Sequence, residues 1–307
     1  MRRWRRGLAE FFFAPASDLW LSVLRTGLGL QVAIYALSLR IDWAFFFAPP
    51  AHALISRQLS EFLVAAESPL IPTLEWLVEG SNRIGVDDRT ALFLIWVALL
   101  LSGVLLMAGL FCRASAITAW LLHLCAAKSG DLLSYGADNF MTIGLFYLML
   151  APLPDSYTLD RKLRKGKAQD AAMLGFFRRI LQIHLCLIYF FGGLTKALGA
   201  GWWNGANIWR ALTRPPFNVI PPELIVTWRH LLPVLGIAIW IIELCYPVFI
   251  WPKKTRLLWL TLACAMHVAI GLTMGMYLFA LIMIVLNVAA FAPLTRATVS
   301  ARNAPPT

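Results

Sequence analysis

The chain has 307 residues, of which 60% are hydrophobic and only 14% are charged, and its mean hydropathy is +0.70. Soluble domains of this length are more polar, so the composition indicates a protein that crosses a membrane several times. The net charge of +11 gathers in short segments between apolar stretches. This pattern argues against a nucleic-acid-binding surface and is typical of the basic inner loops of membrane proteins.

The chain opens with a basic segment, residues 1–18, in which Arg2, Arg3, Arg5 and Arg6 precede the first apolar stretch. That stretch has no convincing cleavage site after it, so we expect a retained signal anchor. A membrane-spanning helix needs about 20 mostly apolar residues. The candidate spans are 19–39, 91–111, 114–127, 140–153, 180–198, 231–251, 257–272 and 276–291, of which the third, fourth and seventh are short.

The basic residues give this chain an orientation. Of its 27 lysines and arginines, 17 fall at 2–6, 113, 161–179, 253–256 and 296–302, whereas the outer segments 40–90 and 199–230 hold seven. Positive charge favours the cytoplasmic side. We therefore expect an all-α bundle of about eight transmembrane helices at 19–295, with both termini cytoplasmic and a disordered tail at 296–307. The two long outer loops predict helices that lie in the membrane interface.

Lys196 is the most informative residue of the fifth span. It lies near the outer end of that span, in the run Leu187-Ile-Tyr-Phe-Phe-Gly-Gly-Leu-Thr-Lys196. A charged side chain deep in a bilayer costs about 2.5–3.5 kcal/mol on insertion scales. Lys196 therefore either snorkels towards the interface, or forms a structural ion pair, or has a function.

Three blocks of the chain carry a family resemblance. They are Leu24-Arg25-Thr-Gly-Leu-Gly-Leu30 followed by 45–48, the segment 129–140 with Ala151-Pro-Leu-Pro154 after it, and Tyr189-Phe-Phe-Gly-Gly-Leu-Thr-Lys196 followed by Trp202-Trp-Asn-Gly205. These blocks resemble the HTTM (horizontally transferred transmembrane) superfamily, which includes the vitamin K-dependent gamma-carboxylases. In this resemblance Lys196 falls on the position of the catalytic-base lysine.

The resemblance implies a membrane enzyme or maturation factor in a bacterial inner membrane. Small bacterial relatives resemble the membrane component of peptide-toxin maturation systems, which implies a secreted peptide or a lipid-soluble molecule as substrate. It also implies a quinone or hydroquinone, similar to vitamin K, as a possible cofactor. The chain departs from the carboxylase pattern near the fourth span, where Asp138 and Asn139 stand in the neighbourhood of an expected histidine.

Polar residues are expected at two depths. Counting about 1.5 Å per residue from the predicted helix ends places Lys128, Asp131, Asp138, Asn139 and Lys196 in the outer third. We predict that they converge on one outward-facing cavity, where an aspartate could instead pair with Lys196. The substrate-binding set is completed by residues on the face or exit of the fifth span: Tyr189, Trp202, Trp203 and Asn204.

The second set lies nearer to the middle of the membrane. Arg25 and Glu243 are predicted to form a structural ion pair, since pairing removes an uncompensated charge. The histidines of this set are His123, His184 and His267. They are expected to form hydrogen bonds between helices or to contact a quinone head group, and haem ligation is a weaker alternative. No metal-binding motif occurs in the sequence.

Three functions are compatible with these patterns. The first is an enzyme or maturation factor with Lys196 as base. The second is a non-catalytic chaperone or carrier subunit that binds a hydrophobic partner, in which Lys196 only anchors a helix. The third is a quinone-linked redox component that uses the histidines.

Overall fold

The computed structural model describes residues 2–48, 57–164 and 169–293, and within these ranges every regular element is a helix. The predicted all-α class is therefore confirmed. Eight long helices form the bundle: α2 (Leu19–Ser38), α6 (Asp88–Ala108), α7 (Cys112–Ser129), α8 (Gly136–Leu150), α10 (Ala171–Leu198), α14 (Leu232–Phe249), α15 (Lys253–Met274) and α16 (Tyr277–Phe291).

Five helical segments of the described chain are long and apolar enough to cross a membrane: α2, α6, α10, α15 and the segment 229–249 that contains α14. Helix α16 is apolar but shorter. The seventh predicted span is longer than the sequence suggested, because α15 begins at Lys253. Helix α7 ends at Ser129, the short 3-10 helix η1 (Asp131–Leu133) follows, and α8 begins at Gly136. The fold is thus a helical membrane bundle.

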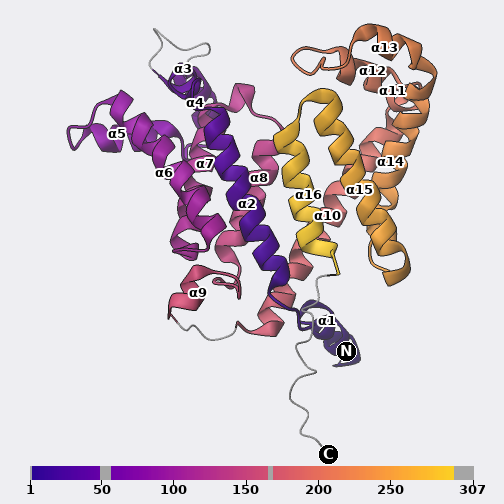
Figure 1. Cartoon of the computed structure of the whole chain (residues 1–307), viewed down its shortest axis with the longest axis horizontal. Helices are drawn as coiled ribbons and strands as arrows, with labels where there is room; N and C mark the ends of the chain where they lie inside the picture. Colours follow the sequence, from indigo (N-terminus) through magenta and orange to yellow (C-terminus); the bar gives the residue numbers. More distant parts are fainter. Residues whose placement is uncertain (1, 49–56, 165–168, 294–307) are drawn as a thin grey trace, which may run out of the picture.

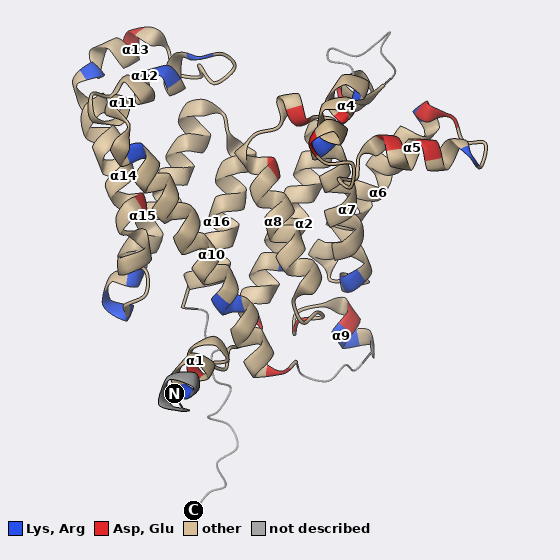
Figure 2. Cartoon of the chain, turned by 180° about the vertical axis from the view of Figure 1, so that it is seen from behind, with Lys and Arg blue, Asp and Glu red and all other residues tan. Residues whose placement is uncertain are grey.

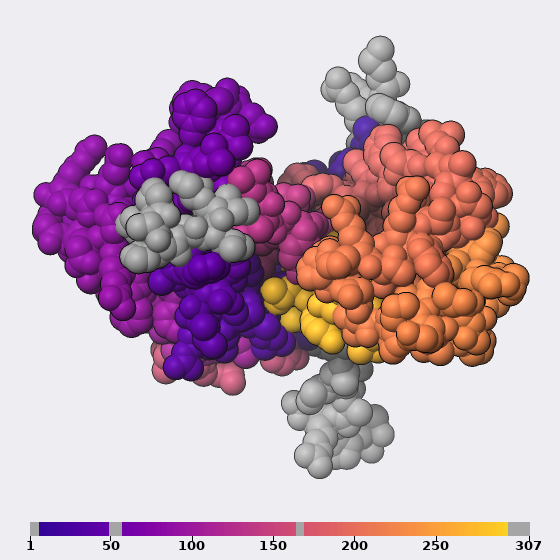
Figure 3. Space-filling view, turned by 90° about the horizontal axis from the view of Figure 1, so that it is seen from above, coloured from indigo at the N-terminus to yellow at the C-terminus, as the bar shows by residue number. Residues whose placement is uncertain are grey.

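The helices form two groups joined by α16. Helices α2, α6, α7 and α8 pack together in one group, and α10 packs extensively against α14 in the other (Figure 1). Helix α16 contacts α2 and α8 on one side and α10 and α15 on the other. Nine of its 15 residues are buried, which is consistent with this central place. Seen from the end that carries α11–α13, the surface is hollowed between the two groups (Figure 3).

Glycines allow the closest helix crossings. A Cβ added at Gly29 would lie 2.8 Å from the carbonyl oxygen of Gly103, and one added at Gly103 would lie 2.8 Å from the nitrogen of Ala33. Helices α2 and α6 therefore touch backbone to backbone at this point. Gly193 has the same role between α10 and α14, because its Cβ would lie 2.4 Å from the nitrogen of Leu244.

Short helices cover the two ends of the bundle. At one end lie α3 (Trp43–Phe47), α4 (Arg57–Glu67), α5 (Leu74–Asn82), α11 (Ala200–Trp203), α12 (Ala206–Thr213), α13 (Pro222–Thr227) and the 3-10 helix η2 (Arg229–Leu231) (Figure 1). These helices form in the two predicted outer loops. At the opposite end lie α1 (Arg2–Phe12), α9 (Leu159–Arg164) and the end of α16.

The charges follow this arrangement. Basic residues mark the start of α15, the first part of α10, α9 and α1, all at the end that carries α1 (Figure 2). The predicted tail at 296–307 lies outside the described residues.

The predicted pair between Arg25 and Glu243 is wrong. Arg25 Nε lies 2.6 Å from Asp155 Oδ2, and its Nη1 donates to the carbonyl oxygens of Leu106 and Met107. Arg25 is only six residues from the start of α2, so its side chain reaches the loop that holds Asp155 at the end of the bundle that carries α1. Both residues of this pair are at most 1% exposed.

Candidate functional site

The centre of the candidate site is an ion pair between two membrane-spanning helices. Lys196 Nζ on α10 lies 2.6 Å from Glu243 Oε2 on α14. The carboxylate is the more enclosed partner, since the Glu243 side chain is 10% exposed and that of Lys196 is 24% exposed. Lys196 Nζ also approaches the Gly192 carbonyl at 3.4 Å and lies 5.4 Å from the ring of Trp202. The pair is thus sheltered but reachable from one side.

A buried polar cluster lies beside this pair and connects the same two helices with α15 and α16. Asn287 of α16 donates from Nδ2 to the Tyr189 hydroxyl at 2.8 Å, and Tyr246 donates to Asn287 Oδ1 at 2.6 Å. The Tyr189 hydroxyl lies 2.7 Å from His267 Nε2 on α15. The rings of Tyr189 and Tyr246 are stacked with centroids 4.1 Å apart. Four helices are therefore tied together by one chain of hydrogen bonds.

Helical spacing connects the pair with this cluster. Tyr189 and Lys196 are seven residues apart on α10, and Glu243 and Tyr246 are three apart on α14. Residues at these spacings share a helix face. The predicted common face of Tyr189 and Lys196 is confirmed, because both side chains contact α14. Lys196 pairs with Glu243, and the ring of Tyr189 stacks on that of Tyr246.

The aromatic residues after α10 differ in how close they lie to the Lys196–Glu243 pair. Trp202 is half-buried beside Lys196 and packs on the small cluster of Ile208, Ile225 and Leu232. Trp203 is exposed and donates from Nε1 to the Ala197 carbonyl at 2.7 Å. The predicted substrate-binding residue Asn204 is also exposed, and its side chain accepts from the Ala206 nitrogen at 3.0 Å. Of these three predicted residues, only Trp202 lies against the Lys196 ammonium.

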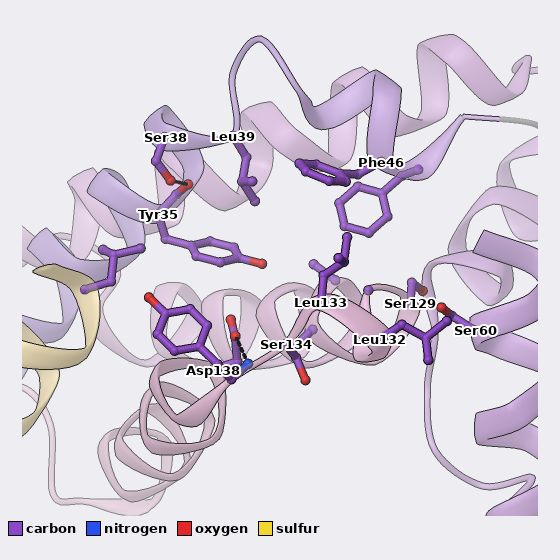
Figure 4. A pocket seen from close by; sticks show the side chains of 16 residues that line it. Tyr35, Ser38, Leu39, Phe46, Ser60, Ser129, Leu132, Leu133, Ser134 and Asp138 are labelled. Carbon is purple, nitrogen blue, oxygen red and sulfur yellow. Dashed lines mark hydrogen bonds between the residues drawn. The ribbon is translucent and has the colours of Figure 1, made fainter. Parts of the chain in front are cut away.

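A separate pocket of about 200 Å³ lies in the other half of the bundle. The Tyr35 ring reaches into it from α2 and the Asp138 side chain from α8, while Phe46 closes the outer side (Figure 4). Asp138 Oδ2 accepts from the Tyr135 nitrogen at 3.0 Å. Burial, with a smaller contribution from the Asp138 charge, raises the pKa of Tyr135 to about 12. Polar and apolar side chains alternate around this pocket, with Ser134 and Asp138 beside Leu132 and Leu133 (Figure 4).

The prediction that five outer residues converge on one cavity is wrong. Lys128 pairs with Asp131 at 3.1 Å, near the pocket of Asp138 but outside its lining. Asn139 is exposed and does not line this pocket. Lys196 belongs to the other group of helices and takes Glu243 as its partner. The reason is helix order, because α16 lies between α8 and α10.

The three intramembrane histidines form hydrogen bonds between helices, as predicted. His123 Nε2 on α7 donates to the Asp138 carbonyl at 3.2 Å, and His184 Nδ1 on α10 lies 3.0 Å from the Tyr147 hydroxyl on α8. His267 on α15 shares a hydrogen bond with the Tyr189 hydroxyl on α10. Each histidine thus has a different partner, and no group of three metal-ligating side chains is found within the described residues.

Sequence reasoning missed three polar residues of these sites: Tyr35, Tyr246 and Asn287. Asn287 offered a signal, because it is the only amide in the apolar helix α16. The two tyrosines offered little, since an aromatic residue within an apolar helix is ordinary core composition.

The fold and the site define a multi-pass membrane protein with an ionisable pair between two of its spanning helices. Comparison with protein-family models, with curated proteins and with solved structures finds no match to this chain.

Proposed function

We propose that this chain is an integral membrane enzyme or maturation factor, similar to the gamma-carboxylases, that acts on a secreted peptide or a lipid-soluble substrate. The observation that carries the proposal is the Lys196–Glu243 pair between α10 and α14. Ionisable residues within spanning helices are costly and commonly mark functional sites. The proposed location is a bacterial inner membrane, with the ends of α1 and α16 cytoplasmic and the end that carries α11–α13 facing outward.

Lys196 is the proposed base and Glu243 its proton acceptor. In this contact the ammonium donates to the carboxylate, and a protonated amine cannot accept a proton. Transfer of one proton across the 2.6 Å contact gives a neutral amine and a neutral carboxylic acid. The low polarity between the helices reduces the free-energy cost of this transfer, because burial penalises both charges. The free amine then takes a proton from the substrate, and the exposed side of Lys196 is where that substrate enters.

A quinone or hydroquinone is the proposed cofactor class, and His267 provides the observation for it. Its Nδ1 is buried without a hydrogen-bond partner among the described residues, while Nε2 meets Tyr189. That ring nitrogen could donate to one oxygen of a quinone, while the Tyr189 hydroxyl is already shared between Asn287 and His267 Nε2. When bound, a hydroquinone supplies two electrons and two protons. In this proposal Tyr189 fixes the orientation of the His267 ring through its hydrogen bond, and the stacked Tyr246 ring keeps water out of the cluster.

The test measures the masses of products, because a change in mass is detectable before the substrate is identified. Cells that express wild-type protein are compared with cells that express Lys196→Met, and secreted peptides and membrane lipids from both are analysed by mass spectrometry. We expect at least one mass-shifted species in wild type that is lost in Lys196→Met. Lys128→Met is the matched control, because Lys128 forms an exposed pair outside the site.

Two further variants separate catalysis from helix anchoring. Lys196→Arg keeps the charge and the pair but is a far weaker acid, so it should lose the product as well. Lys196→Met combined with Glu243→Leu replaces the pair by apolar side chains, a change that is often neutral for stability. A folded double variant without product supports the proposal. Product formation by Lys196→Arg or by the double variant would instead support a carrier in which Lys196 only anchors a helix.

A further inference from the structure

A second, larger cavity lies between α14 and α15 and has no part in the proposed chemistry. Its volume is about 500 Å³, within the range of small-molecule sites. Helices α12 and α13 cover its outer end, with Ile208 and Trp228 in the lining. Thr273 is the one lining residue that is not apolar, and its hydroxyl donates to the Ala269 carbonyl at 2.7 Å. Apart from this hydroxyl and the indole N–H of Trp228, the walls of the cavity are apolar.

The length of the cavity matches one hydrocarbon chain of a lipid. Along α14 its lining runs from Leu232 to Ile242, and along α15 from Met274 back to Leu262. Ten to twelve residues of α-helix cover about 15–18 Å. One leaflet of a bilayer core is about 15 Å deep, half of the whole core. Both helices are long and apolar enough to cross a membrane, so the cavity lies at the depth of the lipid chains.

The segment 199–231, which covers the outer end of the cavity, is basic. Residues 199–231 hold three arginines and one glutamate, a formal charge of +2, whereas residues 40–90 in the other outer loop hold four arginines and seven acidic residues, a formal charge of −3. The three arginines, Arg210, Arg214 and Arg229, are exposed on or beside α12 and η2 (Figure 2). This charge complements an anionic head group above an apolar slot.

We infer that the α14–α15 cavity binds one chain of an anionic phospholipid from the outer leaflet, with the head group held by these arginines. The chain packs on Ile208, Ile225 and Leu232, the cluster that also supports Trp202. Because the Trp202 ring lies 5.4 Å from Lys196 Nζ, the lipid stabilises one wall of the ion-pair site. The inference does not rest on the proposed base chemistry, since the lipid is a resident ligand.

The experiment measures lipid retention by the full chain. Protein in vesicles of dioleoyl-phosphatidylcholine and dioleoyl-phosphatidylglycerol at equal amounts is extracted in mild detergent and analysed by native mass spectrometry. We expect one phosphatidylglycerol per chain. Ala269→Phe fills the cavity and should reduce retention at least about tenfold, the effect of losing the burial of two methylenes. Val268→Trp is the matched control, because the neighbouring Val268 is exposed on α15 outside the lining.

A second comparison tests the head group. Arg210→Gln combined with Arg214→Gln and Arg229→Gln should lower the preference for phosphatidylglycerol by about fivefold per arginine in contact and leave the retention of a lipid intact. Circular dichroism checks that Ala269→Phe folds, and Ala265→Phe in the same lining is the substitute if it does not. Equal retention by the cavity variants and wild type, or wild-type protein without bound lipid, would overturn the inference. An unchanged head-group preference in the triple variant would overturn the role of the arginines.

Discussion

Removal of Asp155 tests the buried pair between Arg25 and Asp155 at the end of the bundle that carries α1. Asp155 is fully buried and holds Arg25 Nε at 2.6 Å, while Ser22 donates to its other oxygen at 2.5 Å. Asp155→Ala leaves the Arg25 guanidinium buried without a carboxylate. Breaking such a pair from one side costs about 3–5 kcal/mol of unfolding free energy. The lost hydrogen bond from Ser22 to this carboxylate adds about 1.5–3 kcal/mol.

The assay is unfolding in mixed micelles, with tryptophan fluorescence as the signal. Asp131→Ala is the matched control, because its pair with Lys128 is exposed and is worth at most about 1 kcal/mol. Arg25→Met combined with Asp155→Leu should recover most of the loss, since both charges are removed together. The reasoning fails if Asp155→Ala costs less than about 1 kcal/mol, or if the double variant is no more stable than the single one.

Two further predictions concern the helix contact and the interface. Gly193→Ala should destabilise the bundle by about 1–3 kcal/mol, because the new Cβ would lie 2.4 Å from the Leu244 nitrogen. Gly80→Ala is the control, since no atom lies within 4 Å of its added Cβ, and an equal loss there would refute the close contact. Burial raises the pKa of Glu61 above 4.5, although its bond from Ser129 opposes the shift. Folding then favours the protonated acid, so wild type should lose stability relative to Glu61→Gln as the pH rises above about 4.5 in melting curves, and parallel curves would contradict this.

The long apolar helices, and the presence of short helices in the two long loops, were predictable because hydropathy and charge are local properties. The stretch at 19–39 became α2 (Leu19–Ser38), and the aromatic run at 45–47 became part of α3 (Trp43–Phe47). Where a predicted helix boundary differed from the observed one, the cause was again a local property of the sequence. Helix α15 begins at Lys253, four residues before the apolar stretch, because basic side chains continue a helix into the interface without cost to its hydrogen bonds.

The partners of the charged residues were not predictable in the same way. Asp155 is 130 residues from Arg25 in the sequence, and Glu243 is 47 residues from Lys196. Which carboxylate meets which cation depends on the order of the helices and on their rotation, and hydropathy specifies neither. The insertion of α16 between the two halves separates Asp138 from Lys196, although both lie towards the outer end of their helices.

The residues around Lys196 indicate that the site is arranged for its ion pair and not only for helix packing. A Cβ at Gly192 would lie 3.2 Å from Glu243 Oε2 and 3.6 Å from Lys196 Nζ, so this glycine leaves room for the two charged groups. Gly193 brings the backbones of α10 and α14 together one residue later. Two apolar side chains would hold such a contact without the cost of desolvating charges. Stability alone therefore does not account for the combination of two glycines with an ammonium and a carboxylate, and the proposed transfer of a proton between the two groups would give this combination a role.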